Sequence, residues 1–381
     1  MTSRRRATSD ESRAGESDAR TARPSSSTPR NARGEFDFIE HLRRGELERI
    51  DALKNSSPFT HHSSLLKGIG DDAAVLRQRA GFDTVVTADL LVEDVDFRLG
   101  RGGISPRDLG HRALAVSLSD VAAMGARPRF CLLSVGVPRG RWRGRFLEEF
   151  YDGVRSLAGA HGVFIVGGDT SRTPERVVVD SIVLGEVRSG RAVLRSGARA
   201  GDQIFVTGWL GGAAAGLKIL EGGAARRSKA PRRSKAPGLV ARQLRPTPRV
   251  EWGALLGERR LASAMIDLSD GLSSDLAHLC RESRAGARVE AASLPLDPLL
   301  ASAGIAPDEA LSLALHGGED FELLFTVSAR DARRLPRELG GVPATRVGEV
   351  TAERGKLKLL SGSVARALRP RGFDHFSRAE D

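Results

Sequence analysis

The chain has 381 residues, of which 40% are hydrophobic and 28% are charged, and its formal net charge is +11. This length and composition predict a globular protein with a sizeable core that is divided into two domains. No run approaches the roughly 18 apolar residues of a membrane-spanning helix, the longest candidate being Phe130 to Val137. The arginines at positions 4 to 6 are not followed by the apolar stretch of an export signal, so we predict a cytoplasmic protein without a membrane span.

The positive charge is concentrated in two segments of low complexity. Residues 1–33 hold eight Arg against four acidic residues, a net charge of +4, and residues 223–238 hold six Arg or Lys and no acid, a net charge of +6. Of the total of +11, a net charge of only +1 is left for the rest of the chain. We predict that residues 1–33 form a disordered basic tail and that residues 223–238, which repeat RRSKAP at Arg226 to Pro237, form a surface insertion. The nearly neutral body is not expected to bind nucleic acid specifically.

Strand and helix patterns alternate along the rest of the chain. In the first half we expect strands at Thr84–Ala88, Phe130–Val137, Val163–Val166 and Val177–Val187, and helices at Pro106–Met124 and Trp142–Ala160. In the second half we expect strands at Gln203–Thr207 and Glu322–Val327, and helices at Gly212–Leu220 and Gly271–Glu282. This mixture predicts an α+β fold with an N-terminal domain over residues 34–190 and a C-terminal domain over residues 191–376.

Several common catalytic signatures are absent from the sequence. The chain has no GxxxxGK[ST] segment, no kinase HRD or DFG set and no HExxH motif, which argues against P-loop, protein-kinase and zinc-protease chemistry. Cys131 and Cys280 lie in apolar segments, far from any metal-ligand spacing, and are predicted to be buried free thiols. The histidines are predicted to be structural or surface residues.

Aspartates next to glycines recur in six segments. These are GIGDDAAVL (Gly68 to Leu76), TADLLVEDVDF (Thr87 to Phe97), LSDVAAMGA (Leu118 to Ala126), GGDTSR (Gly167 to Arg172), IDLSDGLSSDL (Ile266 to Leu276) and GGEDFELLF (Gly317 to Phe325). Mg²⁺ prefers oxygen ligands, and glycine lets phosphate approach backbone N–H groups. Asp and Gly also favour turns and helix caps, so a cap, turn or solvated role stays open for Asp71, Asp108 and Asp275. Six segments in one chain nevertheless favour a site for Mg²⁺ and phosphate, with each segment forming a turn beside a strand or helix.

At these residues the sequence resembles the thiamine-monophosphate kinases, which share a superfamily with aminoimidazole-ribonucleotide synthetase and selenophosphate synthetase. The resemblance runs from about Gly34 to Phe376, and the motifs follow the family's order. They are GEFDFIEHL, ALAVSLSDVAAMGARP, GGDTSR, LRSGA (Leu194 to Ala198), IDLSDGL, GGEDFEL and the closing GFDHF.

The resemblance implies both a fold and an activity. The fold is the two-domain synthetase-superfamily fold, in which the N-terminal sheet-and-helix domain binds ATP and Mg²⁺ and forms a homodimer, followed by a C-terminal α/β domain. The activity is ATP-dependent phosphorylation of thiamine monophosphate to thiamine diphosphate with several Mg²⁺ ions. Because the acceptor is already a phosphate oxyanion, we expect direct in-line transfer without a general base or a covalent enzyme residue.

The resemblance also implies a set of site residues. The metal ligands would be Asp72, Thr87, Asp89, Asp120, Asp169, Asp267 and Asp270. The ATP contacts would be Tyr151, Gly168, Asp169, Arg195 and Ser269, and the substrate contacts would be Asp96, Glu319 and Phe373.

Asp96 departs from the family pattern, because the family commonly has a substrate-contacting His at this position. An acidic side chain suits the cationic rings of thiamine but would repel a phosphate. Two alternatives therefore stay open. One is another ATP-dependent synthetase of the superfamily, although selenophosphate synthesis would require a reactive Cys near the N-terminus and the purine enzyme lacks this combination of motifs. The other is a non-catalytic nucleotide- or nucleic-acid-binding protein.

Overall fold

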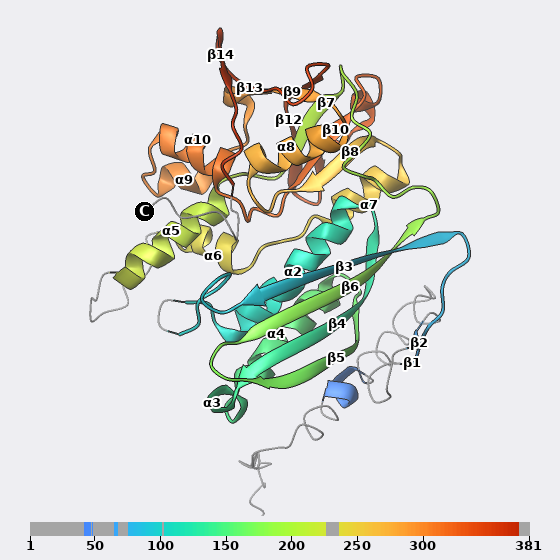
Figure 1. Cartoon of the computed structure of the whole chain (residues 1–381), viewed down its shortest axis with the longest axis vertical. Helices are drawn as coiled ribbons and strands as arrows, with labels where there is room; N and C mark the ends of the chain where they lie inside the picture. Colours follow the sequence, from blue (N-terminus) through green and yellow to red (C-terminus); the bar gives the residue numbers. More distant parts are fainter. Residues whose placement is uncertain are drawn as a thin grey trace, which may run out of the picture.

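The computed structural model describes residues 42–46, 48, 65–67, 75–100, 103–225 and 236–372. Two sheets with their helices account for most of this part of the chain (Figure 1). The predicted basic tail, the RRSKAP repeat up to Lys235, and the predicted site residues Asp72 and Phe373 lie outside the described residues.

The N-terminal sheet has four strands in the order β3-β6-β4-β5. They are β3 (Phe82–Val92), β4 (Arg127–Pro138), β5 (Phe164–Thr173) and β6 (Val178–Arg188). Only β4 and β5 are parallel, because α4 (Phe146–Ala160) forms the crossover between them. In Figure 1 this helix and α2 (Pro106–Ala123) cover the far face of the sheet. The short elements β1 (Leu65–Lys67), β2 (Val75–Leu76) and α3 (Arg139–Trp142) complete this half.

Helix α2 is enclosed on nearly all sides. It begins after Ser105, whose Oγ accepts a hydrogen bond from the N–H of Asp108 at 3.1 Å, with Pro106 in the first turn. Thirteen of its 18 residues are buried, so it is not a surface helix with one apolar stripe. Its strand-facing side packs against β3 and β6, and its other side packs against elements of the C-terminal half. Helix α2 therefore touches both domains along its length.

Helices α2 and α4 approach each other through two glycines. A Cβ atom added to Gly153 would lie 1.9 Å from the carbonyl oxygen of Arg107, and one added to Gly110 would lie 1.9 Å from that of Phe150. Backbone cannot yield to such an overlap without moving the helix. This contact fixes the position of α2 against the sheet.

We expect Gly153→Ala to lower the free energy of unfolding by about 2 kcal/mol or more, because the added methyl group overpacks this contact. Gly159→Ala is the matched control on the same helix, since a Cβ atom there meets nothing within 4 Å. The control should be neutral or stabilising by up to about 1 kcal/mol, from helix propensity alone. Denaturant unfolding of both variants measures the difference, and equal stabilities would contradict the expected crowding.

The C-terminal sheet follows the order β14-β13-β9-β12-β7-β10-β8, with β11 paired to β12. Its strands are β7 (Gln203–Thr207), β8 (Ala262–Asp267), β9 (Gly286–Glu290), β10 (Leu323–Val327), β11 (Glu338–Leu339), β12 (Val342–Thr351), β13 (Leu357–Ser361) and β14 (Val364–Ala367). The helices are α5 (Gly212–Ala225), α6 (Pro237–Leu244), α7 (Val250–Glu258), α8 (Leu272–Glu282), α9 (Pro298–Ser302) and α10 (Pro307–His316), with short 3₁₀ turns at Ala291–Ser293 and Asp331–Arg334.

One hydrophobic core runs through both halves. The cluster that contains Leu114 and Leu118 of α2 continues to Phe205 and Phe325 of the C-terminal sheet and to Trp252 of α7. The rings of Phe205 and Phe325 stack with centroids 5.6 Å apart. A second cluster packs the opposite face of that sheet against α8. Apolar burial therefore holds the two domains in one arrangement.

The predicted α+β fold is confirmed, and each expected strand and helix is present; β7 has the expected ends, whereas the others differ at one end or both. The expected domain boundary lies in the connection between β6 and β7. The prediction that all six acidic segments form turns is wrong: Asp89 lies within β3, Asp120 within α2, and GGDTSR within β5. None of the described helices combines the length and apolarity needed to cross a membrane.

Candidate active site

Strand β3 and helix α2 bring three predicted metal ligands together. Thr87 and Asp89 lie two residues apart on β3, so both side chains point to the α2 side of the sheet. The Thr87 hydroxyl donates to Oδ2 of Asp120 at 2.5 Å, and the Ser117 hydroxyl lies 2.7 Å from Oδ2 of Asp89 and donates to it. Each carboxylate is thus oriented by a hydroxyl from the facing element.

Asp267 joins this group from the C-terminal domain. It is the last residue of β8 and is 3% exposed. The Ser119 hydroxyl on α2 donates to its Oδ2 at 2.8 Å. About one turn of α2, which carries Ser117, Ser119 and Asp120, therefore contacts carboxylates or hydroxyls of both domains. We call Asp89, Asp120 and Asp267 the carboxylate cluster.

Burial and mutual repulsion raise the pKa values in the carboxylate cluster. Burial, followed by the charge of Asp120, raises the pKa of Asp89 to about 6. The same two causes raise the pKa of Asp267 to about 7. Burial also raises the pKa of Asp120, against the hydrogen bond from Thr87 and the positive charge of Arg195. A bound cation would stabilise the charged forms of these buried, mutually repelling carboxyl groups.

Among the described residues, no three acidic, imidazole or thiol groups already surround a common point where a metal ion could sit. The carboxylate cluster is therefore a set of neighbouring oxygen ligands rather than a closed cage. Mg²⁺ commonly binds in this way, with a few carboxylates completed by water and substrate phosphates.

The loop after Asp267 carries Ser269 and Asp270 to the N-terminus of α8. This helix starts after Gly271, whose φ of 104° is in the region that favours glycine. The Asp275 carboxylate accepts a hydrogen bond from the N–H of Asp270 at 3.1 Å, and burial raises the pKa of Asp275 to about 8. The expectation of a cap or turn role for Asp275 fits this contact. A helix N-terminus beside the carboxylate cluster is suited to hold phosphate.

Arg195 lies in the connection between the domains. Its side chain is exposed, and its positive charge offsets part of the rise in the pKa values of Asp120 and Asp267. The Ser283 hydroxyl donates to the Arg195 carbonyl at 2.9 Å, which anchors the backbone next to α8. Arg195 therefore lies near enough to Asp120 and Asp267 to influence their charge, and its contact with ATP stays a prediction.

Glu319 lies in a strained turn before β10. Its φ is 59°, and its N–H donates to the carbonyl of Ser269 at 2.8 Å, which joins this turn to the loop after β8. Its carboxylate contacts the guanidinium of Arg112 on α2 and the side-chain amide of Gln243 on α6. Glu319 is thereby tied to the same helix that carries Asp120.

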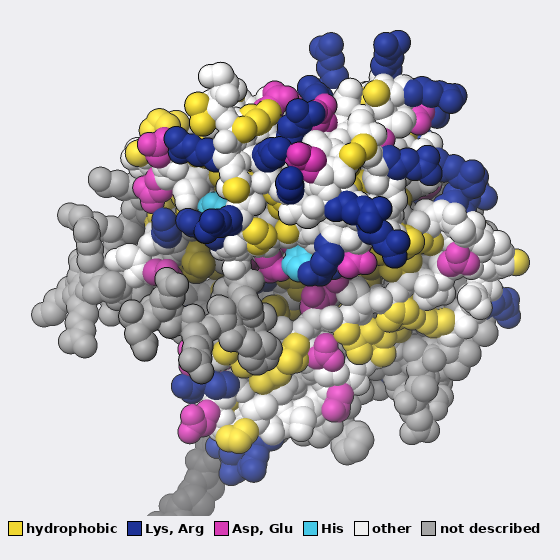
Figure 2. All heavy atoms as spheres, turned by 45° about the horizontal axis from the view of Figure 1, so that its top comes forward, with side chains coloured by type: hydrophobic (Ala, Val, Ile, Leu, Met, Phe, Trp, Pro, Cys, Tyr) yellow, Lys and Arg dark blue, Asp and Glu magenta, His cyan; other side chains and the backbone are white. Residues whose placement is uncertain are grey.

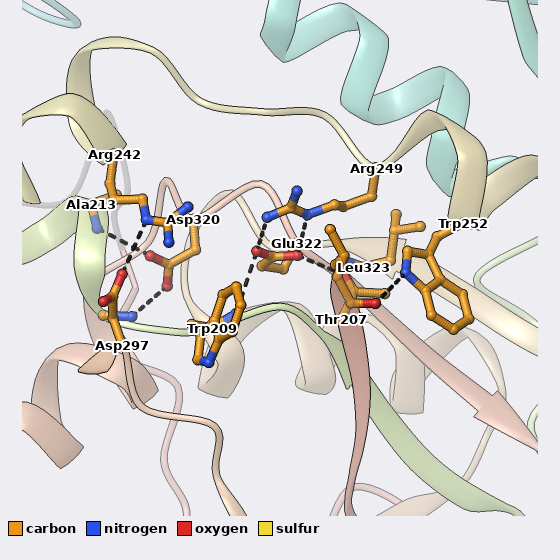
Figure 3. A network of polar contacts seen from close by, with 12 residues as sticks. Thr207, Trp209, Ala213, Arg242, Arg249, Trp252, Asp297, Asp320, Glu322 and Leu323 are labelled. Atoms are coloured by element: carbon orange, nitrogen blue, oxygen red, sulfur yellow. Dashed lines mark hydrogen bonds and ion pairs between the residues drawn. The ribbon is translucent and has the colours of Figure 1, made fainter. Parts of the chain in front are cut away.

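The two acidic residues that follow fix this turn in place (Figure 3). Asp320 accepts hydrogen bonds from two backbone N–H groups at the start of α5, at 2.7 and 3.2 Å. Its burial raises its pKa to about 7. Glu322 forms a buried bidentate ion pair with Arg249 and accepts a hydrogen bond from Thr207 at 2.7 Å. Three neighbouring acidic residues thus hold one segment against three different parts of the molecule.

Asp96 lies in the turn that follows β3 and is partly buried. Its Oδ2 accepts a hydrogen bond from the N–H of Val92 at 2.7 Å, so the carboxylate closes its own turn. The neighbouring Glu93 is buried and accepts a hydrogen bond from Val177 N–H at 2.8 Å and one from Arg141 at 2.9 Å. The hydrogen bond from Val92 shows how an acidic side chain is accommodated at position 96.

Tyr151, a predicted ATP contact, is a buried residue. It lies on α4 and is 3% exposed within the N-terminal core, edge-on to Phe150 with ring centroids 5.3 Å apart. Burial raises its pKa far above the usual range. The ring is enclosed by the N-terminal core, and the contact of Tyr151 with ATP stays a prediction.

Gly168 and Asp169 lie at the opposite edge of the N-terminal sheet from Asp89. Three strand spacings separate β3 from β5, or about 14 Å. Gly168 pairs with Leu133, which faces the helices, and Asp169 pairs with the next residue, Ser134. Because successive side chains of a strand point to opposite faces, the exposed Asp169 side chain points to the face that α2 does not cover. Gly168 is required by close approach, because a Cβ there would lie 2.0 Å from the Leu133 carbonyl oxygen. Within one chain, Asp89 and Asp169 do not share a metal ion.

Four contributors to the site were not anticipated from the sequence: Ser117, Ser119, Arg112 and Gln243. The serines precede Asp120 in ALAVSLSD, and polar residues spaced along an otherwise apolar helix are a usable signal. Arg112 in the same helix offers a weaker signal of this kind. Nothing in the local sequence around Gln243 indicates its contact with Glu319.

Both halves of the chain match one protein family. Residues 70–187 match the family described as "AIR synthase related protein, N-terminal domain", and residues 199–359 match its C-terminal counterpart. The chain therefore has the two domains of the AIR synthase-related family, one in each half.

Similarity to individual proteins is more specific. The thiamine-monophosphate kinase of Bacillus subtilis (strain 168) is 37% identical over 336 residues, covering 87% of this chain and all of that protein. The crystal structure of thiamine-monophosphate kinase from Stenotrophomonas maltophilia K279a is 38% identical with a TM-score of 0.71, covering 83% of this chain and 96% of that one. A structure described as "AaThiL complexed with AMPPCP and TMP" is 28% identical with a TM-score of 0.65, covering 90% and 97%. The chain belongs to the thiamine-monophosphate kinase family.

Proposed function

We propose that this chain transfers the γ-phosphoryl group of ATP to thiamine monophosphate and so forms thiamine diphosphate. The observation that carries this proposal is the carboxylate cluster, in which α2 connects Asp89 and Asp120 of one domain with Asp267 of the other. Support also comes from the family, one member of which is described in complex with AMPPCP and TMP.

The residues of the cluster suit Mg²⁺. Their donor atoms are carboxylate oxygens, which are the ligands that a hard cation prefers, and burial and mutual repulsion raise the pKa values of Asp89 and Asp267, so a bound cation would stabilise their charged forms. Asp89, Asp120 and Asp267 would hold Mg²⁺, with Thr87 and Asp270 beside them and Asp72 as a further predicted ligand. When bound, Mg²⁺ would neutralise the charge of the two phosphate groups that meet in the reaction.

The chain's own residues then position and orient the reactants. Thr87, Ser117 and Ser119 orient the cluster, and Arg195 with the α8 N-terminus beside Ser269 would bind the ATP phosphates. The acceptor phosphate needs no deprotonation, so direct in-line transfer requires no general base. Glu319 and Phe373 would contact the thiamine rings, and Asp96 would lie at the substrate end.

The position of Asp169 favours a homodimer. Asp169 cannot reach Asp89 in its own chain, but a second copy could bring its β5 edge to the β3 edge of the first. The part of this sheet face along β3 suits contact with a second copy, because Val86 and Leu90 there are 61% and 59% exposed. Figure 2 shows hydrophobic side chains in a band across the lower half of that view, where Figure 1 places β3. We propose that Gly168 and Asp169 complete the site of the neighbouring copy.

The first test is diphosphate formation from thiamine monophosphate with ATP and Mg²⁺. Turnover should occur on the monophosphate and not on thiamine or aminoimidazole precursors, and removal of Mg²⁺ with EDTA should abolish it reversibly. Mg²⁺-dependent ATP binding without turnover of the monophosphate would contradict the proposed substrate and favour another synthetase of the superfamily. A cytoplasmic location and the absence of specific nucleic-acid binding stay predictions.

A further inference from the structure

Arg112 connects the two domains at Glu319. It lies in the second turn of α2, and its side chain is 3% exposed. One terminal nitrogen donates to the Gln243 carbonyl at 2.7 Å, and the other contacts one carboxylate oxygen of Glu319. The Gln243 side-chain amide donates to the second carboxylate oxygen. The Glu319 carboxylate is therefore held by an N-terminal helix and a C-terminal helix together.

This arrangement is costly, so stability alone is a poor reason for it. Glu319 has a φ of 59°, which is unfavourable for any residue other than glycine. Nε of Arg112 and Oε1 of Gln243 are buried and have no hydrogen-bond partner within the described part of the chain. Unpaired buried polar atoms and strained backbone collect at functional sites, where geometry matters more than stability.

Accessibility separates the two members of the ion pair. About a third of the Glu319 side chain is exposed (32%), whereas the Arg112 side chain is almost wholly enclosed. A ligand can therefore reach the carboxylate, while the guanidinium lies beneath it. The neighbouring residues of α2 do not share this role, because Asp108 pairs with Arg245 at 3.1 Å and His111 donates to the Pro246 carbonyl at 2.9 Å.

We propose that Arg112 is a positioning residue for the cationic rings of the substrate: it fixes the Glu319 carboxylate from the opposite domain without touching the substrate itself. The inference rests on the proposed function and on the proposed contact between Glu319 and thiamine. If this is so, Arg112 acts on substrate binding only through Glu319. Gln243 has the same role, as the uncharged side chain that donates to the second carboxylate oxygen of Glu319.

The variants to compare are Arg112→Gln, Arg112→Lys and the control Arg127→Gln. Arg127 also joins the two domains, with ion pairs to Glu258 at 2.9 Å and Glu251 at 3.3 Å, but it does not contact Glu319. Arg112→Gln should raise KM for thiamine monophosphate about tenfold or more, as expected for loss of a charge-assisted hydrogen bond, and should leave KM for ATP within about twofold. Arg112→Lys should restore part of the loss, and the control should match the unaltered protein.

Thiamine, used as a competitive inhibitor, separates positioning of the rings from a direct contact with the phosphate. It lacks the phosphate, so its inhibition constant should rise by the same factor as KM in Arg112→Gln. An unchanged inhibition constant beside a raised KM would place Arg112 at the phosphate and overturn the inference.

A double-mutant comparison gives the decisive result. In a Glu319→Gln background, Arg112→Gln should change KM by less than about twofold, because its effect passes through Glu319. Full additivity of the two substitutions would overturn the inference. If Arg112→Gln does not fold, Gln243→Ala carries the same comparison. Lack of turnover by the unaltered chain would instead contradict the proposed function, so the two failures are distinguishable.

Discussion

Asp120→Asn is expected to reduce kcat for thiamine diphosphate formation by about a hundredfold or more while the protein stays folded. Asp120 is the member of the carboxylate cluster whose charge raises the pKa values of both Asp89 and Asp267, so it interacts with both of the other members. Neutralising it removes a proposed metal ligand and leaves Thr87 without its charged acceptor. Steady-state kinetics with saturating ATP and Mg²⁺ measures the loss.

The melting temperature distinguishes lost chemistry from lost folding. Without Mg²⁺, Asp120→Asn should melt at the same temperature as the unaltered protein or higher, because one of several mutually repelling buried charges is gone. Mg²⁺ and ATP together should stabilise the variant less than the unaltered protein. Asp152→Asn on the exposed side of α4 is the control and should keep full activity. Near-normal turnover by Asp120→Asn would refute the proposed mechanism.

Mixing two inactive variants, Asp89→Asn and Asp169→Asn, is expected to restore about a quarter of the normal activity. Each variant alone should be nearly inactive, because each loses one proposed metal ligand. If the site combines Asp89 of one copy with Asp169 of the other, a mixed dimer contains one site with both substitutions and one site with neither. Random assortment makes half of the dimers mixed, and half of their sites are intact.

The experiment requires subunit exchange, which refolding the variants together provides. Refolding each variant separately before mixing is the control and should give no recovery. If co-refolding also gave none, while the unaltered protein refolded to full activity, Asp89 and Asp169 would not come together across two copies.

The sequence was a good guide where local pattern and tertiary structure agree. Helix α2 follows from Ser105 and Pro106 at its start and from the long apolar run behind them. The strands β3, β4 and β6 follow from runs of β-branched and apolar residues. The strands β9, β12 and β13 were not predicted, because runs with interspersed charged residues resemble loops until sheet pairing is known, and β12 also contains a proline and a glycine.

The site was less predictable, because long-range packing assembles it. Asp89 and Asp267 are 178 positions apart in the sequence, and only the placement of α2 between the domains makes them neighbours. Likewise, the motif GGDTSR does not reveal that β5 forms the edge of the sheet opposite β3.

Helix α2 has a consequence for substrate length. Arg112 contacts Glu319 near one end of the helix, and Asp120 belongs to the carboxylate cluster near the other. Eight residues at 1.5 Å each set these two contacts about 12 Å apart along one rigid helix. In some compounds the chain between the cationic ring and the phosphate is several ångströms shorter or longer than in thiamine monophosphate. Such a compound would reach either Glu319 or the carboxylate cluster, but not both. The helix would thereby select substrates by their span as well as by their charge.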